Sequence, residues 1–312
     1  MPRIVYLSWP PKEITGGIKV AFQHVEMLVE AGFDSVIASP DAQRPDWFET
    51  KVAVIAFDAI RADDVLVFPE NNPNFIAPFA SSGQPKVVFC QNAHMAGQGL
   101  GGRLSYAEFG VTHIMCPSMN VVRFCTQRFP GLKLGYTPFF IDHSRFAFNP
   151  SKTLQIAVIP RKRMMEFAEI ADLLRARYPE HGSLPWIYLH GVSENDVAAS
   201  MARSAIFLSL ARLEAHSMTK LEAMACGCVV AGFTGVFGGD DSATSRNGFW
   251  AAEDDVEGAT EQLARAIGLV KAGGESHRMM VEEGRMTALQ YSREASARYL
   301  VKFWKDFGLA PS

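Results

Sequence analysis

Short apolar runs alternate along the first half of the chain with segments in which apolar residues recur every three or four positions. The runs have the length of buried strands and lie at residues 4–7, 35–38, 52–57, 65–68, 86–90 and 112–116. After the first run, residues 17–31 place Ile18, Phe22 and Val25 on one face of a predicted helix. Strands separated by helices or crossovers predict a parallel sheet with helices on both faces.

A proline-bounded segment with neither period, residues 136–150, indicates a connection between domains. The pattern then restarts with strands at 154–159, 186–189, 205–210 and 228–232 and helices at 164–178, 195–202, 218–225 and 256–272. The sequence therefore predicts an α/β protein with two Rossmann-like, doubly wound domains, at residues 1–147 and 148–290. A final helix at 291–307, with aromatic residues near one side, is expected to pack back onto the N-terminal domain.

Composition excludes several classes of protein. The chain has 312 residues, which favours two domains, and its formal net charge of −3 without a polybasic run argues against a nucleic-acid partner. Five cysteines without a CxxC pair indicate neither a disulfide framework nor a zinc site. The opening residues follow a strand pattern rather than that of a secretion signal, and no apolar run approaches the ~18–20 residues of a membrane span. These features favour a reduced, cytoplasmic location.

The segment LEAHSMTKLEAMACG, residues 213–227, places two acids eight positions apart. Glu214 follows the strand at 205–210, so it should lie at the carboxyl edge of the sheet, where open α/β sheets bind ligands. Ser217 is expected to cap a helix that begins at Met218, whose first N–H groups attract anions. Glu222 lies about one turn inside. Two carboxylates flanking an anion site suit the hydroxyls and phosphates of a nucleotide diphosphate sugar, although an ordinary helix with exposed acids has the same local pattern.

The wider sequence resembles the retaining family-4 glycosyltransferases, which have the GT-B fold. The resemblance is carried by E-x7-E running into LEAMACG-x-V-V, by PPKEITGGIKVAFQHVEMLVEAGF near the N-terminus and by FFIDHSRFAFNP between the halves. It covers most of the chain in the expected order. It implies two domains facing across a cleft, a nucleotide diphosphate sugar as co-substrate, no cofactor, and a glycan, lipid-linked precursor or small molecule as acceptor.

The resemblance also assigns site residues. It implies that Glu214 lies near the donor sugar and that Glu222 binds the ribose. Further donor contacts are implied at Gly16, Gly17, Gly191, His216, Ser217 and Met218.

A basic cluster, PRKR at residues 160–163, follows a predicted strand at the same edge. Relatives commonly use an Arg and a Lys here to neutralise the departing diphosphate, so Arg161 with either Lys162 or Arg163 is expected to do so. The spacing is tighter than the family's, and it leaves the second cation open. Taken alone, such a run is also typical of a solvated turn.

The chain departs from the family pattern after the strand at 86–90. Many relatives carry a histidine directly there, whereas this chain has Gln91 and Asn92, with His94 slightly later. These three residues and Glu70 are candidate contacts for the donor sugar or the acceptor. No Asp-x-Asp stands at a strand end, so no metal site is expected.

The sequence thus predicts a retaining, metal-independent glycosyltransferase. Two alternatives remain open: a non-catalytic GT-B protein that binds nucleotide sugars, and a GT-B sugar-nucleotide epimerase. A nicotinamide dehydrogenase is disfavoured because no GxGxxG follows the first strand. Trp9, Trp47 and Phe75 could touch the inner face of a membrane, but core packing explains them equally well. The nucleotide base, the sugar, the acceptor and the oligomeric state are left open.

Overall fold

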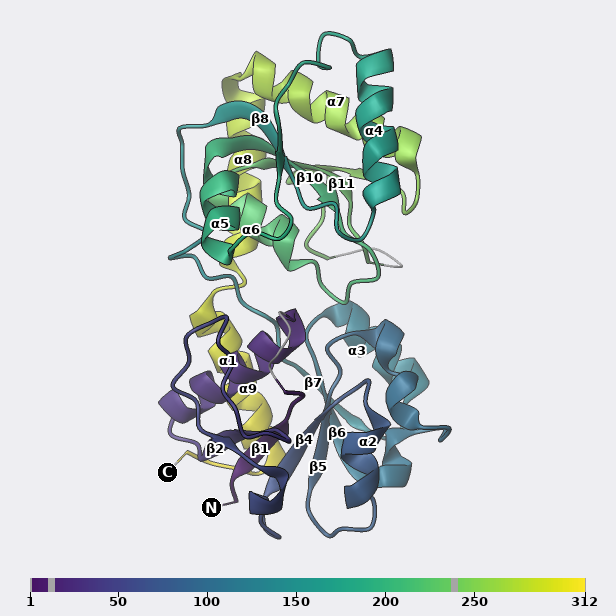
Figure 1. Cartoon of the computed structure of the whole chain (residues 1–312), viewed down its shortest axis with the longest axis vertical. Helices are drawn as coiled ribbons and strands as arrows, with labels where there is room; N and C mark the ends of the chain where they lie inside the picture. Colours follow the sequence, from purple (N-terminus) through teal and green to yellow (C-terminus); the bar gives the residue numbers. More distant parts are fainter. Residues whose placement is uncertain (1, 11–14, 237–240, 312) are drawn as a thin grey trace. The chain divides into compact units, whose positions relative to one another are not determined.

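The computed structural model describes residues 2–10, 15–236 and 241–311. The chain divides into two compact units (Figure 1). The N-terminal unit contains Met1–Phe139 and Glu294–Ser312, and the C-terminal unit contains Phe140–Arg293. Each unit is built on one parallel sheet.

The sheet of the N-terminal unit has the strand order β3-β2-β1-β4-β5-β6-β7, and every neighbouring pair is parallel. Its strands are β1 (Ile4–Leu7), β2 (Ser35–Ala38), β3 (Val54–Ile55), β4 (Val65–Pro69), β5 (Lys86–Phe89), β6 (Val111–Cys116) and β7 (Lys133–Tyr136). Its α-helices are α1 (Gly16–Glu30), α2 (Pro73–Ile76), α3 (Met119–Arg128) and α9 (Arg293–Phe307), which begins at the boundary residue Arg293. Short 3-10 turns are η1 (Phe57–Ala59), η2 (Ala77–Phe79), η3 (Ala93–Met95), η4 (Gln98–Leu100) and η5 (Tyr106–Phe109).

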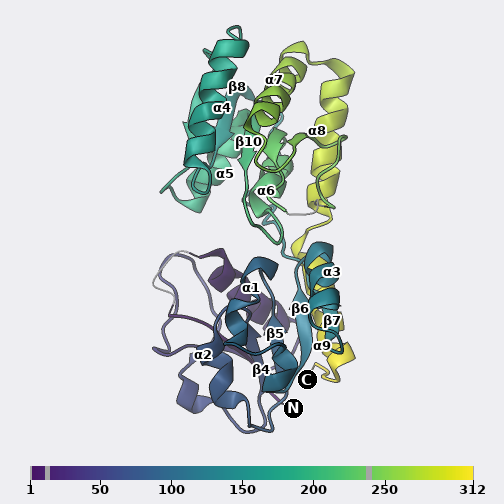
Figure 2. The ribbon, with the colours of Figure 1, turned by 90° about the vertical axis from the view of Figure 1, so that its right-hand side faces the viewer.

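The last helix, α9, closes the N-terminal unit at the edge strand β7 (Figure 2). The Ser296 hydroxyl donates to the carbonyl of Pro138 at 2.6 Å, and Trp304 is fully buried. Gly135 lets α9 approach closely, because a Cβ there would stand 2.1 Å from the ring of Phe303. The end of the chain is thereby fixed to the unit in which the chain begins.

The sheet of the C-terminal unit has the order β12-β11-β10-β8-β9, again with parallel neighbours. Its strands are β8 (Thr153–Val158), β9 (Trp186–Tyr188), β10 (Ser204–Leu210), β11 (Val229–Phe233) and β12 (Gly248–Ala251). Its helices are α4 (Met164–Arg177), α5 (Glu194–Arg203), α6 (Met218–Cys226), α7 (Val256–Ala272) and α8 (Gly274–Leu289).

Each face of this sheet has its own core, because successive side chains of a strand point to opposite sides. Helices α4 and α7 lie on one face of the sheet and α5 and α6 on the other (Figure 1). Ile206 and Leu208 pack with residues of α4 and α7, whereas Phe207 packs with residues of α5 and α6. Buried on both faces, the central strand β10 is apolar along most of its length, which is typical of a parallel sheet.

The doubly wound pattern predicted from the sequence is present in both units, but some elements differ. The run at 52–57 contains only the two-residue strand β3. The sequence did not predict α3, β7, α8 or β12. The fully buried residues of helix α8 are only Gly284 and Ala288. The helix therefore lacks the repeating apolar positions by which a helix is predicted from sequence. The connection beyond Phe139 lies in the C-terminal unit, where Ile141 donates its N–H to the carbonyl of Tyr291 at 2.8 Å.

Candidate functional site

The turn between β10 and α6 places Glu214 at the carboxyl edge of the C-terminal sheet. Leu213, just before it, has a positive φ of 51°, a conformation uncommon outside glycine. The N–H of Glu214 donates to the carbonyl of Gly235 at 2.9 Å. Gly235 itself has a φ of 73°, and a Cβ there would stand 2.4 Å from that of Ala211. The turn is therefore fixed by close backbone packing, which orients the half-buried Glu214.

Lys162 extends from the loop after β8 to the same place. Its Nζ lies 2.6 Å from Oε1 of Glu214 and also donates to the carbonyl of Arg212 at 3.2 Å. Arg161, beside it, is exposed and makes no hydrogen bond or ion pair with any other described residue. Lys162 and Glu214 thus form an ion pair at this edge, next in sequence to the exposed Arg161.

Arg163 points the opposite way, into the unit. Its side chain is fully buried, with Nε donating to the carbonyl of Ala211 at 3.1 Å and the guanidinium lying 4.3 Å above the ring of Phe233. The same guanidinium forms ion pairs with three carboxylates, those of Glu166, Glu253 and Asp254.

This position corrects the expectation that Arg163 has a catalytic role. All its nitrogens are engaged by the protein, so it holds together the loops that follow β8, β10 and β12. Its hydrogen bond keeps the pKa of Asp254 below the usual value. Of the two candidates for a second diphosphate cation, only Lys162 reaches the edge.

Helix α6 begins next to Glu214. Ser217 occupies its N-cap position, but the expected capping bond is absent from the described structure: the Ser217 hydroxyl instead lies 3.4 Å from that of Thr219. Among the described residues, the Ser217 side chain therefore does not cap α6, whose first residue is Met218. Glu222 is half-buried, while Leu221 beside it is fully buried. The two acids flank the start of the helix, as the spacing predicted.

Two side chains of this segment, Lys220 and His216, are buried. Lys220 is fully buried within the first turn of α6, where burial lowers its pKa to about 7, an effect that Glu214 opposes. The ring of His216 is also buried, 4.7 Å from that of Tyr291, and burial lowers its pKa to about 3. The predicted donor contact at His216 is made by its backbone, so burial of the side chain does not contradict it. The sequence could have indicated the burial of Lys220, because it is the one lysine in the mostly apolar segment MTKLEAMA.

Gly191 follows β9 with a φ of 69°, and nothing lies within 4 Å of where its Cβ would be. The preceding Tyr188 is an exposed aromatic residue at the end of that strand.

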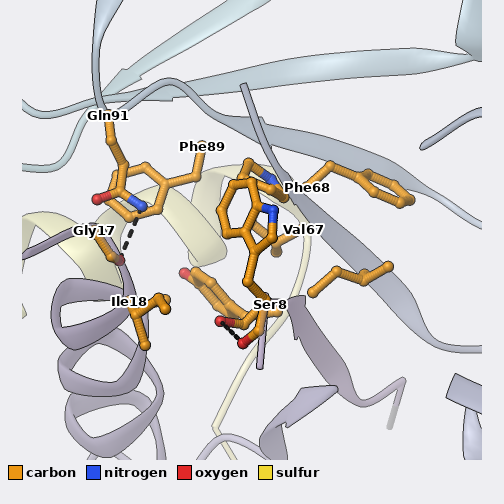
Figure 3. A pocket seen from close by; sticks show the side chains of 12 residues that line it. Ser8, Gly17, Ile18, Val67, Phe68, Phe89 and Gln91 are labelled. Carbon is orange, nitrogen blue, oxygen red and sulfur yellow. Dashed lines mark hydrogen bonds between the residues drawn. The ribbon is translucent and has the colours of Figure 1, made fainter. Parts of the chain in front are cut away.

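In the N-terminal unit, Gln91 joins the end of β5 to the start of α1. Its Nε2 donates to the carbonyl of Gly17 at 3.1 Å, as the dashed line in Figure 3 shows. Gly16 and Gly17 form the first residues of α1, while residues 11–14 of the glycine-containing segment lie outside the described structure. The Asn92 side chain accepts from the N–H of His94 at 3.1 Å, and His94 itself is exposed.

Glu70 is not the rim acid that the sequence suggested. It is 3% exposed, and its Oε1 accepts from the N–H of Asn92 at 2.8 Å. Burial raises its pKa to about 7 despite these backbone hydrogen bonds. Glu70 therefore anchors the Gln91–Asn92 turn from inside the unit, which corrects its assignment as a direct sugar or acceptor contact.

The three aromatic residues considered for membrane contact differ in burial: Phe75 is buried, whereas Trp9 and Trp47 are half-buried. All five cysteines are free thiols and buried. Within the described ranges, no three His, Cys, Asp or Glu side chains are arranged to hold a metal ion. In the same ranges, no helix combines the length and apolar character needed to cross a membrane.

The sequence of this chain is similar to those of known proteins. Residues 186–287 match the family described as Glycosyl transferases group 1. Over 283 residues, the chain is 26% identical to a curated alpha-1,6-glucosyltransferase from Actinobacillus pleuropneumoniae serotype 7 (strain AP76), covering 84% of this chain and 83% of the relative. These matches support the glycosyltransferase resemblance seen in the sequence.

Solved structures show the fold. HepE of Anabaena, in complex with UDP and glucose, superposes with a TM-score of 0.70 at 12% identity, covering 98% of this chain and all of that one. Sucrose-phosphate synthase from Thermosynechococcus elongatus gives 0.65 at 14% identity, covering 98% and 99%. A glycosyltransferase from Rickettsia africae ESF-5 gives 0.69 at 12% identity, covering 98% of each. The chain has the GT-B fold, as the sequence predicted.

Replacing Arg163 tests its structural role. Arg163→Met should lower the free energy of unfolding by about 2–4 kcal/mol, because three carboxylates and the carbonyl of Ala211 lose their buried partner. Urea denaturation measures this, with Arg161→Met as the exposed control, expected to stay within about 0.5 kcal/mol of wild type. Equal stability of the two variants would contradict the role.

Glu70 should make stability depend on pH. Burial raises the pKa of Glu70 from the ordinary value of 4.5 to about 7, so between these values the native state retains a proton that the unfolded chain has lost. The contribution of Glu70 to the free energy of unfolding therefore falls as pH rises from about 4.5 to about 7. Glu70→Gln keeps an acceptor for Asn92 and removes this titration. Wild type should lose on the order of 1–3 kcal/mol relative to Glu70→Gln from pH 5 to 8 in urea denaturation. Parallel pH profiles would refute the assignment.

Proposed function

We propose that this protein is a retaining glycosyltransferase that moves a sugar from a nucleotide diphosphate sugar to a hydroxyl group of an acceptor. The observation that carries the proposal is the pairing of Lys162 with Glu214 at 2.6 Å, beside the start of α6. A cation, a carboxylate and the start of a helix lie there on one edge of the C-terminal sheet. The match of residues 186–287 to the group 1 glycosyl transferases supports it.

The donor is proposed to lie along this edge. Its diphosphate would accept hydrogen bonds from the first N–H groups of α6, at Ser217 and Met218, and from Arg161 and Lys162. Glu214 would accept from a sugar hydroxyl and Glu222 from the ribose, while the base would lie near Gly191. When the donor binds, its phosphate competes with Glu214 for Lys162, which frees the carboxylate for the sugar.

The chemistry requires stabilisation of a leaving group. The bond from the anomeric carbon to the phosphate oxygen breaks, and a bond to the acceptor oxygen forms on the same face. The acceptor's hydroxyl proton passes to the departing phosphate. Arg161, Lys162 and the α6 dipole stabilise the charge that develops on that phosphate, and protein cations take the place of a metal ion.

The relatives suggest where to look for the donor. One is named an alpha-1,6-glucosyltransferase and another was solved with UDP and glucose, so we propose a UDP-hexose, with UDP-glucose tested first. The acceptor is proposed to be a glycan or a lipid-linked precursor. Five buried free thiols are compatible with the proposed cytoplasmic location.

The experiment is a panel of sugar nucleotides, scored by thermal shift and by slow hydrolysis with and without EDTA. One donor should raise the melting temperature and be hydrolysed at the same rate in EDTA. Binding without turnover, even with a broad set of acceptors, would favour a non-catalytic binding protein. A new sugar nucleotide as product would favour an epimerase. NMR of the anomeric proton in the transfer product shows whether the configuration at the anomeric carbon is retained.

Glu222 should govern nucleotide affinity. Glu222→Ala removes a charged acceptor for the ribose hydroxyls, so the dissociation constant of the nucleoside diphosphate should rise about 10–100-fold. Isothermal titration calorimetry measures it. The matched control is Glu261→Ala on the exposed side of α7, which should bind like wild type. Unchanged affinity in Glu222→Ala would disprove the ribose assignment.

Arg161 should govern turnover instead. Arg161→Ala is expected to lower kcat about 100–1,000-fold with a smaller effect on nucleotide affinity, because its charge matters most as the diphosphate departs. Lys162→Met should lower kcat in the same way. Steady-state kinetics on the donor found by the panel decide this. Wild-type kcat in both variants would remove these cations from the mechanism.

A further inference from the structure

Two cysteines lie side by side at the carboxyl edge of the N-terminal sheet. Cys90 directly follows β5, and Cys116 is the last residue of β6. The register pairs Phe89 with Met115, the residues just before them, and the N–H of Cys90 donates to the carbonyl of Met115 at 3.0 Å. The same register therefore places Cys90 opposite Cys116.

Both thiols meet a third one, Cys125, which belongs to α3. Successive residues of a strand point to opposite faces of the sheet. The ring of Phe89 stacks on that of His24 of α1 at 4.5 Å, so the side chain of Cys90 points to the other face. There, the thiol of Cys125 forms hydrogen bonds with those of both Cys90 and Cys116. All three side chains are fully buried, so they form one cluster inside the unit.

Cys125 has the central position in this cluster. Hydrogen bonds from Cys116 and from Cys90 lower the pKa of the Cys125 thiol, although its burial opposes the shift. The same hydrogen bonds raise the pKa of the two thiols that donate them. Among these three sulfurs, Cys125 therefore becomes a thiolate most readily. The thiolate is the form of cysteine that attacks an oxidant.

The geometry favours a cross-link that includes Cys125. Neighbouring strands lie about 4.8 Å apart, whereas the β-carbons of a disulfide lie about 3.5–4.5 Å apart, so a bond between Cys90 and Cys116 would pull β5 and β6 together. Cys125 comes from a helix and is not held at the spacing of the strands. The buried residues of α3 are only Val121 and Cys125, so local opening of this helix costs little free energy and admits a small oxidant.

We propose that this cluster is a redox-sensitive modification site, at which hydrogen peroxide joins Cys125 to Cys90 or Cys116 in a reversible disulfide. The Cys125 thiolate attacks one peroxide oxygen and the O–O bond breaks, which gives a sulfenic acid and, with a proton, water. The neighbouring thiol then attacks the sulfenic sulfur, the S–O bond breaks, and the leaving hydroxide departs as water with that thiol's proton. Two thiols are oxidised, and the peroxide is reduced to two waters.

The two cysteines of the C-terminal unit provide a contrast within the same chain. Cys226 and Cys228 are buried like those of the cluster. Burial raises the pKa of Cys226 to about 12 and that of Cys228 to about 11, and the Cys228 thiol donates to the carbonyl of Met201 at 3.1 Å. Both therefore remain protonated and should react with peroxide more slowly than Cys125.

Thiol mapping on the full chain is the first test. The reduced protein is treated with hydrogen peroxide, the remaining thiols are alkylated in urea, and the peptides are identified by mass spectrometry. Wild type should lose two of its five thiols and yield a disulfide-linked peptide that contains Cys125. Dithiothreitol should restore the two lost thiols. When the protein is unfolded in urea before oxidation, the preference for Cys125 should disappear, because the fold creates the cluster.

Cys125→Ser should slow the loss of thiols at least about tenfold. Cys226→Ser is the matched control, because Cys226 is also a fully buried cysteine of a helix, and it should oxidise like wild type. Circular dichroism identifies any variant that fails to fold, and the mapping of wild type then carries the test.

The inference is overturned if Cys125 stays reduced, if dithiothreitol does not restore it, if Cys226 or Cys228 reacts first, or if folded Cys125→Ser oxidises as fast as wild type. No sugar nucleotide enters these measurements, so their outcome is independent of the proposed function.

Discussion

The buried guanidinium of Arg163 is the interaction on which the C-terminal edge depends. From the loop after β8, it contacts Glu166 of α4, the carbonyl of Ala211 after β10, and Glu253 and Asp254 after β12. Those loops carry Lys162 and Glu214, so the rim exists in its present form because a cation lies beneath it. Removing a charge from water is costly, and the many hydrogen bonds of a planar guanidinium make that position tenable.

A buried carboxyl has the corresponding position in the N-terminal unit. Glu70 accepts from the backbone of Asn92 and thereby sets the turn that presents Gln91. Gln91 in turn bonds to the first turn of α1. In both units, a buried ionisable side chain holds the backbone of a turn at the edge of the sheet. Arg163 does so through the carbonyl of Ala211, and Glu70 through the N–H of Asn92.

The rim of the C-terminal sheet brings opposite charges together next to the start of a helix. Lys162 pairs with Glu214 there, beside the first residues of α6. Under the proposed function, this rim suits the phosphates and hydroxyls of a nucleotide sugar.

The sequence alone determined the doubly wound architecture and the placing of Glu214 and Glu222 around the start of α6. These features follow from local rules: buried strands are continuous apolar runs, and a helix fixes the spacing of its own residues. Tertiary structure decided which members of PRKR face outwards, since the partners of Arg163 at Ala211 and Glu253 lie 48 and 90 residues away. It also decided that Glu70 is buried and that Gln91 bonds to the start of α1, because contacts at a strand end depend on residues that arrive from other parts of the chain.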